Sequence, residues 1–223
     1  MQLRKRGGKW YVRGTEGGRA VKERPILFSG PMVRAILAGQ KTCTRRVVKL
    51  PRWAEPGSEI EEGTFGPVTT ARVSGCLAEI ACPYGKPGDA LWVRETWLPH
   101  EFDDTAELAT YRADCNDGPV PAAVRAEREG RTRWHSARYM PRVASRITLR
   151  VTAVEVQRLH DITADDAVRE GISGSTKAMF GRTNDAARID EFRRLWCGIN
   201  GAESWEDNPL VWVVRFERKA GAQ

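Results

Sequence analysis

Hydrophobic and polar positions predict a strand and then a helix at the start of the folded part of the chain. Residues 26–28 are consecutive apolar residues and predict a short buried strand. The apolar positions between 32 and 37 recur at helical spacing, with Ser29 as N-cap, Pro31 in the first turn and Gly39 at the C-terminal end. This helix therefore leads directly into the polar residues after Gly39.

The later hydrophobic patterns predict several further strands. Residues 90–94, 109–113 and 210–216 each have a strand pattern. The longest pattern covers residues 145–159, and its apolar phase slips by one residue near positions 152–153. Such a slip predicts a bulge or a sharp bend, as expected where a sheet curls toward a barrel.

Helices and loops between these strands predict an α+β fold. Thr163 opens a capping box, with Asp166 in place of the usual Glu, for a helix that stops at Gly171. An amphipathic helix is predicted from residue 186 to Gly198. Unequal loops between the strands favour a curved mixed β-sheet or small β-barrel with flanking helices. Weaker patterns predict a hairpin over 71–80, a short charged helix over 122–129 and loops over 49–88 and 173–184.

Composition favours a soluble protein without metal or cofactor. Of the 223 residues, 41% are hydrophobic and 29% are charged, and no apolar run approaches the roughly 18 residues of a membrane helix. The N-terminus lacks the apolar segment of a secretory signal. The five cysteines are scattered without a CxxC pair, and the three histidines stand apart. We expect a cytoplasmic protein of a bacterial or phage-infected cell, with no membrane partner.

Positive charge is concentrated at the N-terminus. Residues 1–24 hold eight basic and two acidic side chains and carry +6 of the net charge of +7. We expect a basic, Gly-rich arm over 1–24 and one domain with long loop insertions over 25–223. The arm either attracts phosphate or is a solvated leader without a partner, and composition leaves both open.

The candidate chemistry lies in the stretch Gly39-Gln40-Lys41-Thr42-Cys43-Thr44-Arg45-Arg46. Arginine can fork onto a phosphate or a base edge, and a desolvated lysine can act as a base. Threonine hydroxyls can bind a polar ligand or attack one. The alternative is an ordinary exposed basic strand.

Two motifs in this order resemble the ASCH domain, a relative of the PUA-like RNA-binding barrels. The first is a helix followed by Gly-x-Lys-Thr-x-Thr-x-Arg at residues 39–46, and the second is Gly-Asp-x-Leu-x-Val at residues 88–93. Residues 91–97 and 140–142 look like the larger ASCH-like proteins of tailed phages and prophages. The likeness spans about residues 25–217 and leaves the arm and the loops near 50–85 and 115–135 uncovered.

The resemblance implies an enzymatic reaction. Some small bacterial ASCH proteins are amidohydrolases that remove the acetyl group from N4-acetylcytidine with a Lys, a Thr and a Glu. The matching positions here are Lys41, Thr44 and, before Gly171, Glu170. On this resemblance Lys41 would deprotonate Thr44 for attack on the acyl carbonyl, and Glu170 would orient the amine or handle the leaving proton. The chain departs from that family in its length and in having Gln40 where a basic residue is common.

Strand geometry supplies a condition for this chemistry. Positions 41 and 44 differ by three, so on a regular strand their side chains point to opposite faces. Catalysis therefore requires a turn or bulge between Lys41 and Thr44. Without it, Thr42, Thr44 and Arg46 share one face, which suits binding.

Further residues are candidates for contact with a ligand. Trp92 and Arg94 are predicted to share a strand face, and Trp134 lies among arginines, so that either indole could stack on a base. Glu95 offers a second carboxylate next to the motif at 88–93. The predicted ligand-binding set contains Thr42, Arg45, Arg46, Trp92, Arg94, Glu95 and Trp134.

Three functions remain open. The first is recognition of a nucleobase, nucleoside or nucleotide, free or in a polymer, RNA rather than DNA, with amidohydrolase or ribonuclease activity as its enzymatic form. The second is a non-catalytic nucleic-acid-binding module. The third is a phage accessory protein whose role is a protein contact.

Overall fold

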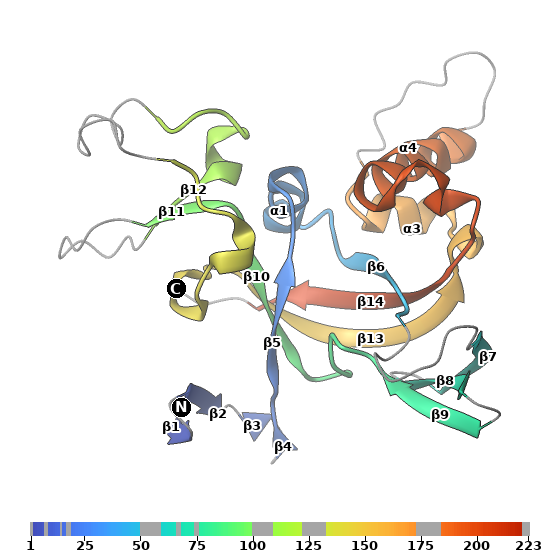
Figure 1. Ribbon diagram of the computed structural model, residues 1–223. Helices are drawn as coiled ribbons and strands as arrows, with labels where there is room; N and C mark the ends of the chain where they lie inside the picture. Colours follow the sequence, from blue (N-terminus) through green and yellow to red (C-terminus); the bar gives the residue numbers. More distant parts are fainter. Residues whose placement is uncertain are drawn as a thin grey trace. The chain divides into compact units, whose positions relative to one another are not determined.

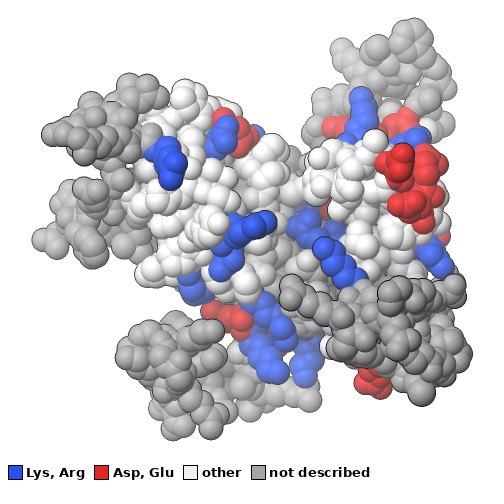
Figure 2. Space-filling view, viewed as in Figure 1, with Lys and Arg blue, Asp and Glu red and all other residues white. Residues whose placement is uncertain are grey.

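The computed structural model describes residues 2–6, 9–13, 15–16, 19–49, 59–65, 68–73, 76–99, 109–121, 133–172 and 184–219, and their side chains within 21–49, 79–99, 109–121, 133–172 and 185–219. The chain divides into two compact units. The first comprises Met1–Gly39, Ala90–Arg150 and Arg218–Gln223, and the second comprises Gln40–Asp89 and Val151–Glu217. Figure 1 shows their elements, and Figure 2 shows the charged side chains of one face.

The first unit contains a parallel pair of strands. β5 (Glu23–Leu27) pairs in parallel with β10 (Ala90–Arg94), and β10 pairs antiparallel with the first residues of β13 (Thr148–Arg158). α1 (Gly30–Leu37) follows β5, with Ser29 at its N-cap, and buries Val33 and Ile36. Helix α1 thus covers apolar surface with the i, i+3 spacing that the sequence predicts.

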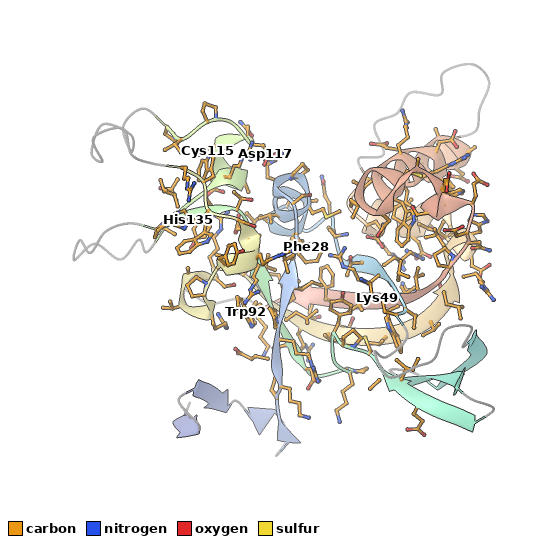
Figure 3. The ribbon with its side chains drawn as sticks, viewed as in Figure 1. Phe28, Lys49, Trp92, Cys115, Asp117 and His135 are labelled. Atoms are coloured by element: carbon orange, nitrogen blue, oxygen red, sulfur yellow. The ribbon has the colours of Figure 1, made fainter. Side chains whose placement is uncertain are left out.

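A carboxylate from a distant segment completes the N-terminus of α1. Asp117 lies so close to Gly30 that a Cβ at this position would overlap its carboxylate oxygen. Arg34, one turn further along α1, binds the same carboxylate at 2.7 Å. Figure 3 labels Cys115, the last residue of the short helix η1 (Arg112–Cys115), and Asp117, which follows this helix. Because α1 has no acidic residue in its first turn, Asp117 supplies the negative charge that stabilises a helix N-terminus.

A smaller cluster packs the remaining part of the first unit. β11 (Trp97–Pro99) and β12 (Ala109–Tyr111) form a hairpin, and Trp97 also makes an isolated bridge to His135. The buried members of this cluster are Trp97, Ala109, Met140 and Ala144. The last two belong to the segment of the short helices η2 (Ala137–Tyr139) and η3 (Arg142–Ala144).

The second unit combines antiparallel strands with two helices. β6 (Cys43–Val47) pairs antiparallel with β14 (Leu210–Arg218), and β14 neighbours β13 in the sheet order β5-β10-β13-β14-β6. α3 (Ala164–Arg169) and α4 (Asn184–Asn200) lie side by side (Figure 1). The short helices η4 (Leu159–Asp161) and η5 (Ala202–Trp205) connect them to the strands.

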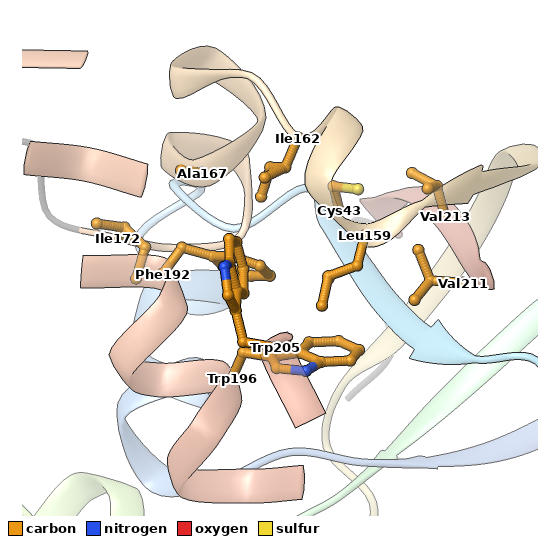
Figure 4. Close-up of a cluster of buried hydrophobic side chains, with 10 residues drawn as sticks. All are labelled: Cys43, Leu159, Ile162, Ala167, Ile172, Phe192, Trp196, Trp205, Val211 and Val213. Carbon is orange, nitrogen blue, oxygen red and sulfur yellow. The ribbon is translucent and has the colours of Figure 1, made fainter. Parts of the chain in front are cut away.

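An aromatic and aliphatic core joins these helices to the sheet (Figure 4). Phe192 and Trp196 from α4 meet Trp205 from η5, with the Phe192 ring 6.1 and 6.2 Å from the two indoles. Cys43, Val211 and Val213 contribute from β6 and β14. Alternate residues of both strands are therefore buried under the helices. The other buried members are Leu159, Ile162, Ala167 and Ile172.

Short strands account for the rest of the described chain. β7 (Glu59–Phe65), β8 (Val68–Val73) and β9 (Cys76–Ala81) form an antiparallel sheet, which contains the predicted hairpin. In the arm, β1 (Gln2–Arg6) pairs with β2 (Lys9–Arg13), and β3 (Thr15–Glu16) pairs with β4 (Arg19–Ala20).

The α+β class with a mixed sheet is confirmed. The described strands form an open five-stranded order with β5 and β6 at its edges, so the alternative of a closed barrel is not seen among them. The prediction of a strand over 109–113 is wrong in its second half, because β12 ends at Tyr111 and the chain continues into the short helix η1. The helix end at Gly198 is also wrong, since α4 continues to Asn200 and Gly201 takes the positive φ of 106°.

The phase slip in β13 occurs where the sequence places it. Leu149 and Val151 are buried, Thr152 is exposed, and Val154 is buried again. The buried positions therefore change from odd to even within one strand. The predicted helix over 122–129 and most of the loop over 173–184 lie outside the described residues. No helix among those described is long and apolar enough to cross a membrane.

Two glycines have enough space for a Cβ atom, so replacing them with alanine tests the effect of backbone conformation without a steric clash. Gly39 has φ of 73°, whereas Gly198 is helical, and a Cβ on either would meet nothing within 4 Å. We expect Gly39→Ala to lower the free energy of unfolding by about 1 kcal/mol, because L-residues are strained at this φ. Gly198→Ala should raise it by up to about 1 kcal/mol. Urea denaturation measures both, and changes of equal sign would contradict this reading.

Candidate functional site

Lys41 and Glu170, two of the residues that the resemblance implies, meet inside the second unit. The Lys41 ammonium donates to the Glu170 carboxylate at 2.7 Å, to the Glu170 carbonyl at 2.8 Å and to the Cys43 carbonyl at 2.8 Å. The two side chains are 0% and 4% exposed. All three Lys41 N–H groups thus have acceptors, and the lysine is held as a donor in a site without water access.

The backbone of α3 determines where Glu170 lies. Thr163 caps this helix by accepting a hydrogen bond from the Asp166 N–H, and Glu170 is its C-terminal cap before Gly171 at φ of 92°. The Thr42 N–H donates to the Arg169 carbonyl at 2.9 Å. The end of α3 is therefore joined to the residue that follows Lys41.

Arg45 extends the ion pair along β6. Its guanidinium donates to Asp166 at 2.8 Å and approaches Glu170 at 3.5 Å and the Gln157 side chain at 3.5 Å. Asp166 and Glu170 are four residues apart, so they lie on the same face of α3. This spacing is the signal by which the sequence could have predicted Asp166 as a member of the site.

The network continues from the interior to the surface. Arg215 of β14 lies 3.8 Å from Asp166 and 3.8 Å from Glu155, whose side chain is 46% exposed. The cations are Lys41, Arg45 and Arg215, and the anions are Glu155, Asp166 and Glu170. The buried charges are therefore balanced within the protein, as buried ions must be to remain charged.

Two groups beside the network have shifted pKa values. Burial raises the pKa of Asp166, but the positive charge and hydrogen bond of Arg45 outweigh it and hold this pKa below its usual value. Burial, with the Glu170 charge adding to it, raises the pKa of the Cys43 thiol to about 12. Cys43 is therefore a neutral packing residue and no nucleophile.

Thr44 points away from this network. Cys43 packs in the core under α3 and α4, and both Lys41 and Arg45 reach Glu170, so positions 41, 43 and 45 share one face. The register of β6 with β14 is regular from Cys43 to Val47, so alternation places Thr44 on the other face from Cys43 and Arg45. Thr44 is buried on the other face, opposite Val214 in the register.

The face opposite the network includes partly exposed polar groups. Arg46 lies opposite Trp212 of β14 and is partly exposed, as is Thr42. Tyr84, also partly exposed, interacts electrostatically with Arg46. Burial raises the pKa of the Tyr84 phenol, and the charge of Arg46 opposes this effect. Sequence reasoning missed Tyr84, because it lies in a turn without any periodic signal.

The remaining predicted ligand residues belong to the first unit and are engaged there. Trp92, labelled in Figure 3, is 8% exposed. The Arg94 guanidinium lies 4.6 Å from the centroid of its ring. Glu95 is buried and receives two hydrogen bonds from Arg146 at 2.9 and 3.1 Å. The Trp134 indole donates to the Gly118 carbonyl at 3.1 Å.

The described residues contain no group of three or more potential metal ligands.

The Asp166–Arg45 pair predicts a pH dependence of stability. A lowered carboxyl pKa stabilises the fold above the unfolded value of about 4, and this stabilisation is lost as the pH falls through the folded pKa. We expect Asp166→Asn to cost about 3 kcal/mol at pH 7, because Arg45 loses its closest anion. The deficit should shrink below pH 4, as measured by urea denaturation between pH 3 and 7.

Asp165→Asn provides the matched control, since Asp165 is exposed in the same helical turn. It should change the free energy of unfolding by less than about 0.5 kcal/mol. An Asp166→Asn deficit that is independent of pH would contradict the charge assignment.

Comparison with known protein families, with curated proteins and with solved structures gives no match to this chain.

Proposed function

We propose that this chain recognises a nucleobase or nucleotide as a PUA-like domain of the ASCH type, with the β6 segment as its binding element. The observation that supports this function is the meeting of Lys41, Arg45 and Glu170 in one buried network. These residues come from segments about 125 residues apart and include Lys41 and Glu170, two of the three positions that the ASCH resemblance implies.

In this proposal the network positions the binding element and does not touch the ligand. Lys41 and Arg45 are 2% and 3% exposed and are bound to carboxylates, so they fix β6 against α3. The ligand contacts come from the partly exposed Thr42 and Arg46. An arginine fork and a threonine hydroxyl match the acceptor and donor edges of a base, and the nearby Tyr84 ring offers a stacking surface.

One observation favours amidohydrolysis as a second candidate. The Lys41 ammonium and Glu170 carboxylate are 2.7 Å apart, a distance at which they can exchange a proton. Hydrolysis of an N4-acylated cytidine at this pair requires opening of the buried contact. It also requires a nucleophile other than Thr44, which faces the opposite side of β6. Water activated by the pair would meet that requirement.

Nucleoside binding tests the proposed function directly. Cytidine, N4-acetylcytidine and the other common nucleosides and nucleotides are screened by thermal stabilisation and then by calorimetry. We expect at least one of these compounds to raise the melting temperature of the protein. Arg46→Ala should weaken the affinity for that compound about tenfold, the range expected for the loss of one arginine–base contact. Arg194→Ala, an exposed arginine on α4 in the same unit, should leave the affinity unchanged.

The two candidates differ in their response to Glu170→Gln and Thr44→Val. If the chain hydrolyses N4-acetylcytidine, chromatography shows cytidine and acetate accumulating, and Glu170→Gln abolishes this while Thr44→Val retains it. If it only binds, no nucleoside is consumed although Arg46→Ala still weakens the complex. An absence of both binding and turnover across the panel would exclude the proposed function.

A further inference from the structure

An arginine-rich segment of the first unit is not explained by the proposed nucleoside site. Residues 133–150 contain five arginines and no aspartate or glutamate. Aromatic residues are interspersed among them, including Trp134 and Tyr139. Basic and aromatic residues in alternation are typical of surfaces that bind nucleic acid.

The fold exposes apolar groups in this segment. Tyr139, at the end of η2, is 74% exposed, and Val143, in η3, is 72% exposed. Among the described residues, no other large hydrophobic side chain is as exposed as these two. The next most exposed is Ile199, at 53%. The neighbouring Met140 and Ala144 are buried, so packing of the segment fixes the direction of both exposed side chains.

Neutral groups orient Arg94, which contacts the main chain of Arg138 beside Tyr139. Arg94 donates to the Arg138 carbonyl at 3.1 Å, and its guanidinium lies 4.6 Å from the centre of the Trp92 ring. The Arg142 guanidinium lies 6.0 Å from the same ring. Stacking on an indole and donation to a carbonyl orient a guanidinium without neutralising its charge.

The surface is consequently positive. Arg142 pairs with Glu23 at 2.9 Å, whereas Arg94 and Arg138 form no ion pair within the part of the chain that the structure describes. Arg138 is exposed. Unneutralised arginines at an exposed ring attract an anion that also carries aromatic groups.

We propose that a single-stranded nucleic acid binds the surface formed by Arg94, Arg138, Tyr139, Arg142 and Val143. The Tyr139 ring stacks on a base, Val143 extends the apolar contact, and the Arg94 and Arg138 guanidinium groups bind phosphates. Arg142 exchanges its ion pair with Glu23 for a phosphate contact. An exposed ring stacks on any base, which favours this ligand over an acidic protein, where the ring has no specific partner. All five residues lie in the first unit, so this binding does not depend on the proposed nucleoside site.

Fluorescence anisotropy with a labelled 12-nucleotide oligouridylate and the full chain tests the proposal. We expect Tyr139→Ala to weaken binding about tenfold and Tyr139→Phe to preserve it within about twofold, because the ring provides the contact. Arg138→Ala should weaken binding and reduce the slope of log affinity against log salt by about 0.7, the value for one phosphate on a single strand. Matched controls are Ile199→Ala and Arg194→Ala on α4, which should leave binding unchanged.

The N-terminal arm is present in every variant, so any attraction that it exerts on the oligonucleotide is the same in all of them. Equal affinities of Tyr139→Ala, Arg138→Ala and the parent chain would overturn the proposal, as would tighter binding of a DNA or RNA duplex than of a single strand. Polyglutamate that competes with the oligonucleotide and binds independently of Tyr139 would instead identify an acidic protein partner. Competition by single-stranded DNA and RNA of equal length identifies which polymer is preferred.

Discussion

The buried contact between Lys41 and Glu170 determines the arrangement of the second unit. A desolvated ammonium and a desolvated carboxylate are each costly, and their cost is offset only when they meet with their remaining hydrogen bonds satisfied. Here the ammonium has three acceptors within 2.8 Å, two of them on Glu170. The segment before β6 and the end of α3 therefore have one favourable relative position, and a shift of either by one residue would leave a buried charge without its partner.

The rest of the network follows from that constraint. Arg45 is two strand positions from Cys43 and reaches the same side of the sheet, where Asp166 and Glu170 are presented together by one face of α3. Such ion networks contribute less to stability than to specificity, because apolar residues of equal volume would pack at lower cost. The same alternation that directs the charges under α3 directs Thr44 and Arg46 to the opposite face. In the proposed function, a single short strand thus separates a positioning face from a binding face.

Local patterns predicted the helices α1, α3 and α4 and several of the strands, because caps and periodicity depend on neighbouring residues alone. Ser29 and Thr163 at their N-caps, β10 over 90–94 and the change of phase in β13 all have such local causes. The sequence also selected Lys41 and Glu170, through the family resemblance and as catalytic residues, and the structure brings their side chains together. It did not predict that Trp92 and Glu95 are buried partners of arginines, since such pairings depend on contacts between distant segments. It likewise missed the end of α4, where Gly198 is accommodated in the helix and Gly201 terminates it.

Thr42 combines a main chain fixed by hydrogen bonds with a side chain that takes no part in them. Its N–H donates to the Arg169 carbonyl and its carbonyl accepts from the Phe216 N–H, both at 2.9 Å, so its peptide groups link a helix end to the C-terminal strand. Neither bond involves the side chain, which is partly exposed. Any residue except proline could preserve the link through its own amide. Mutation at this codon can therefore alter what the surface contacts while the scaffold is inherited unchanged, a route by which related chains could diverge in ligand preference.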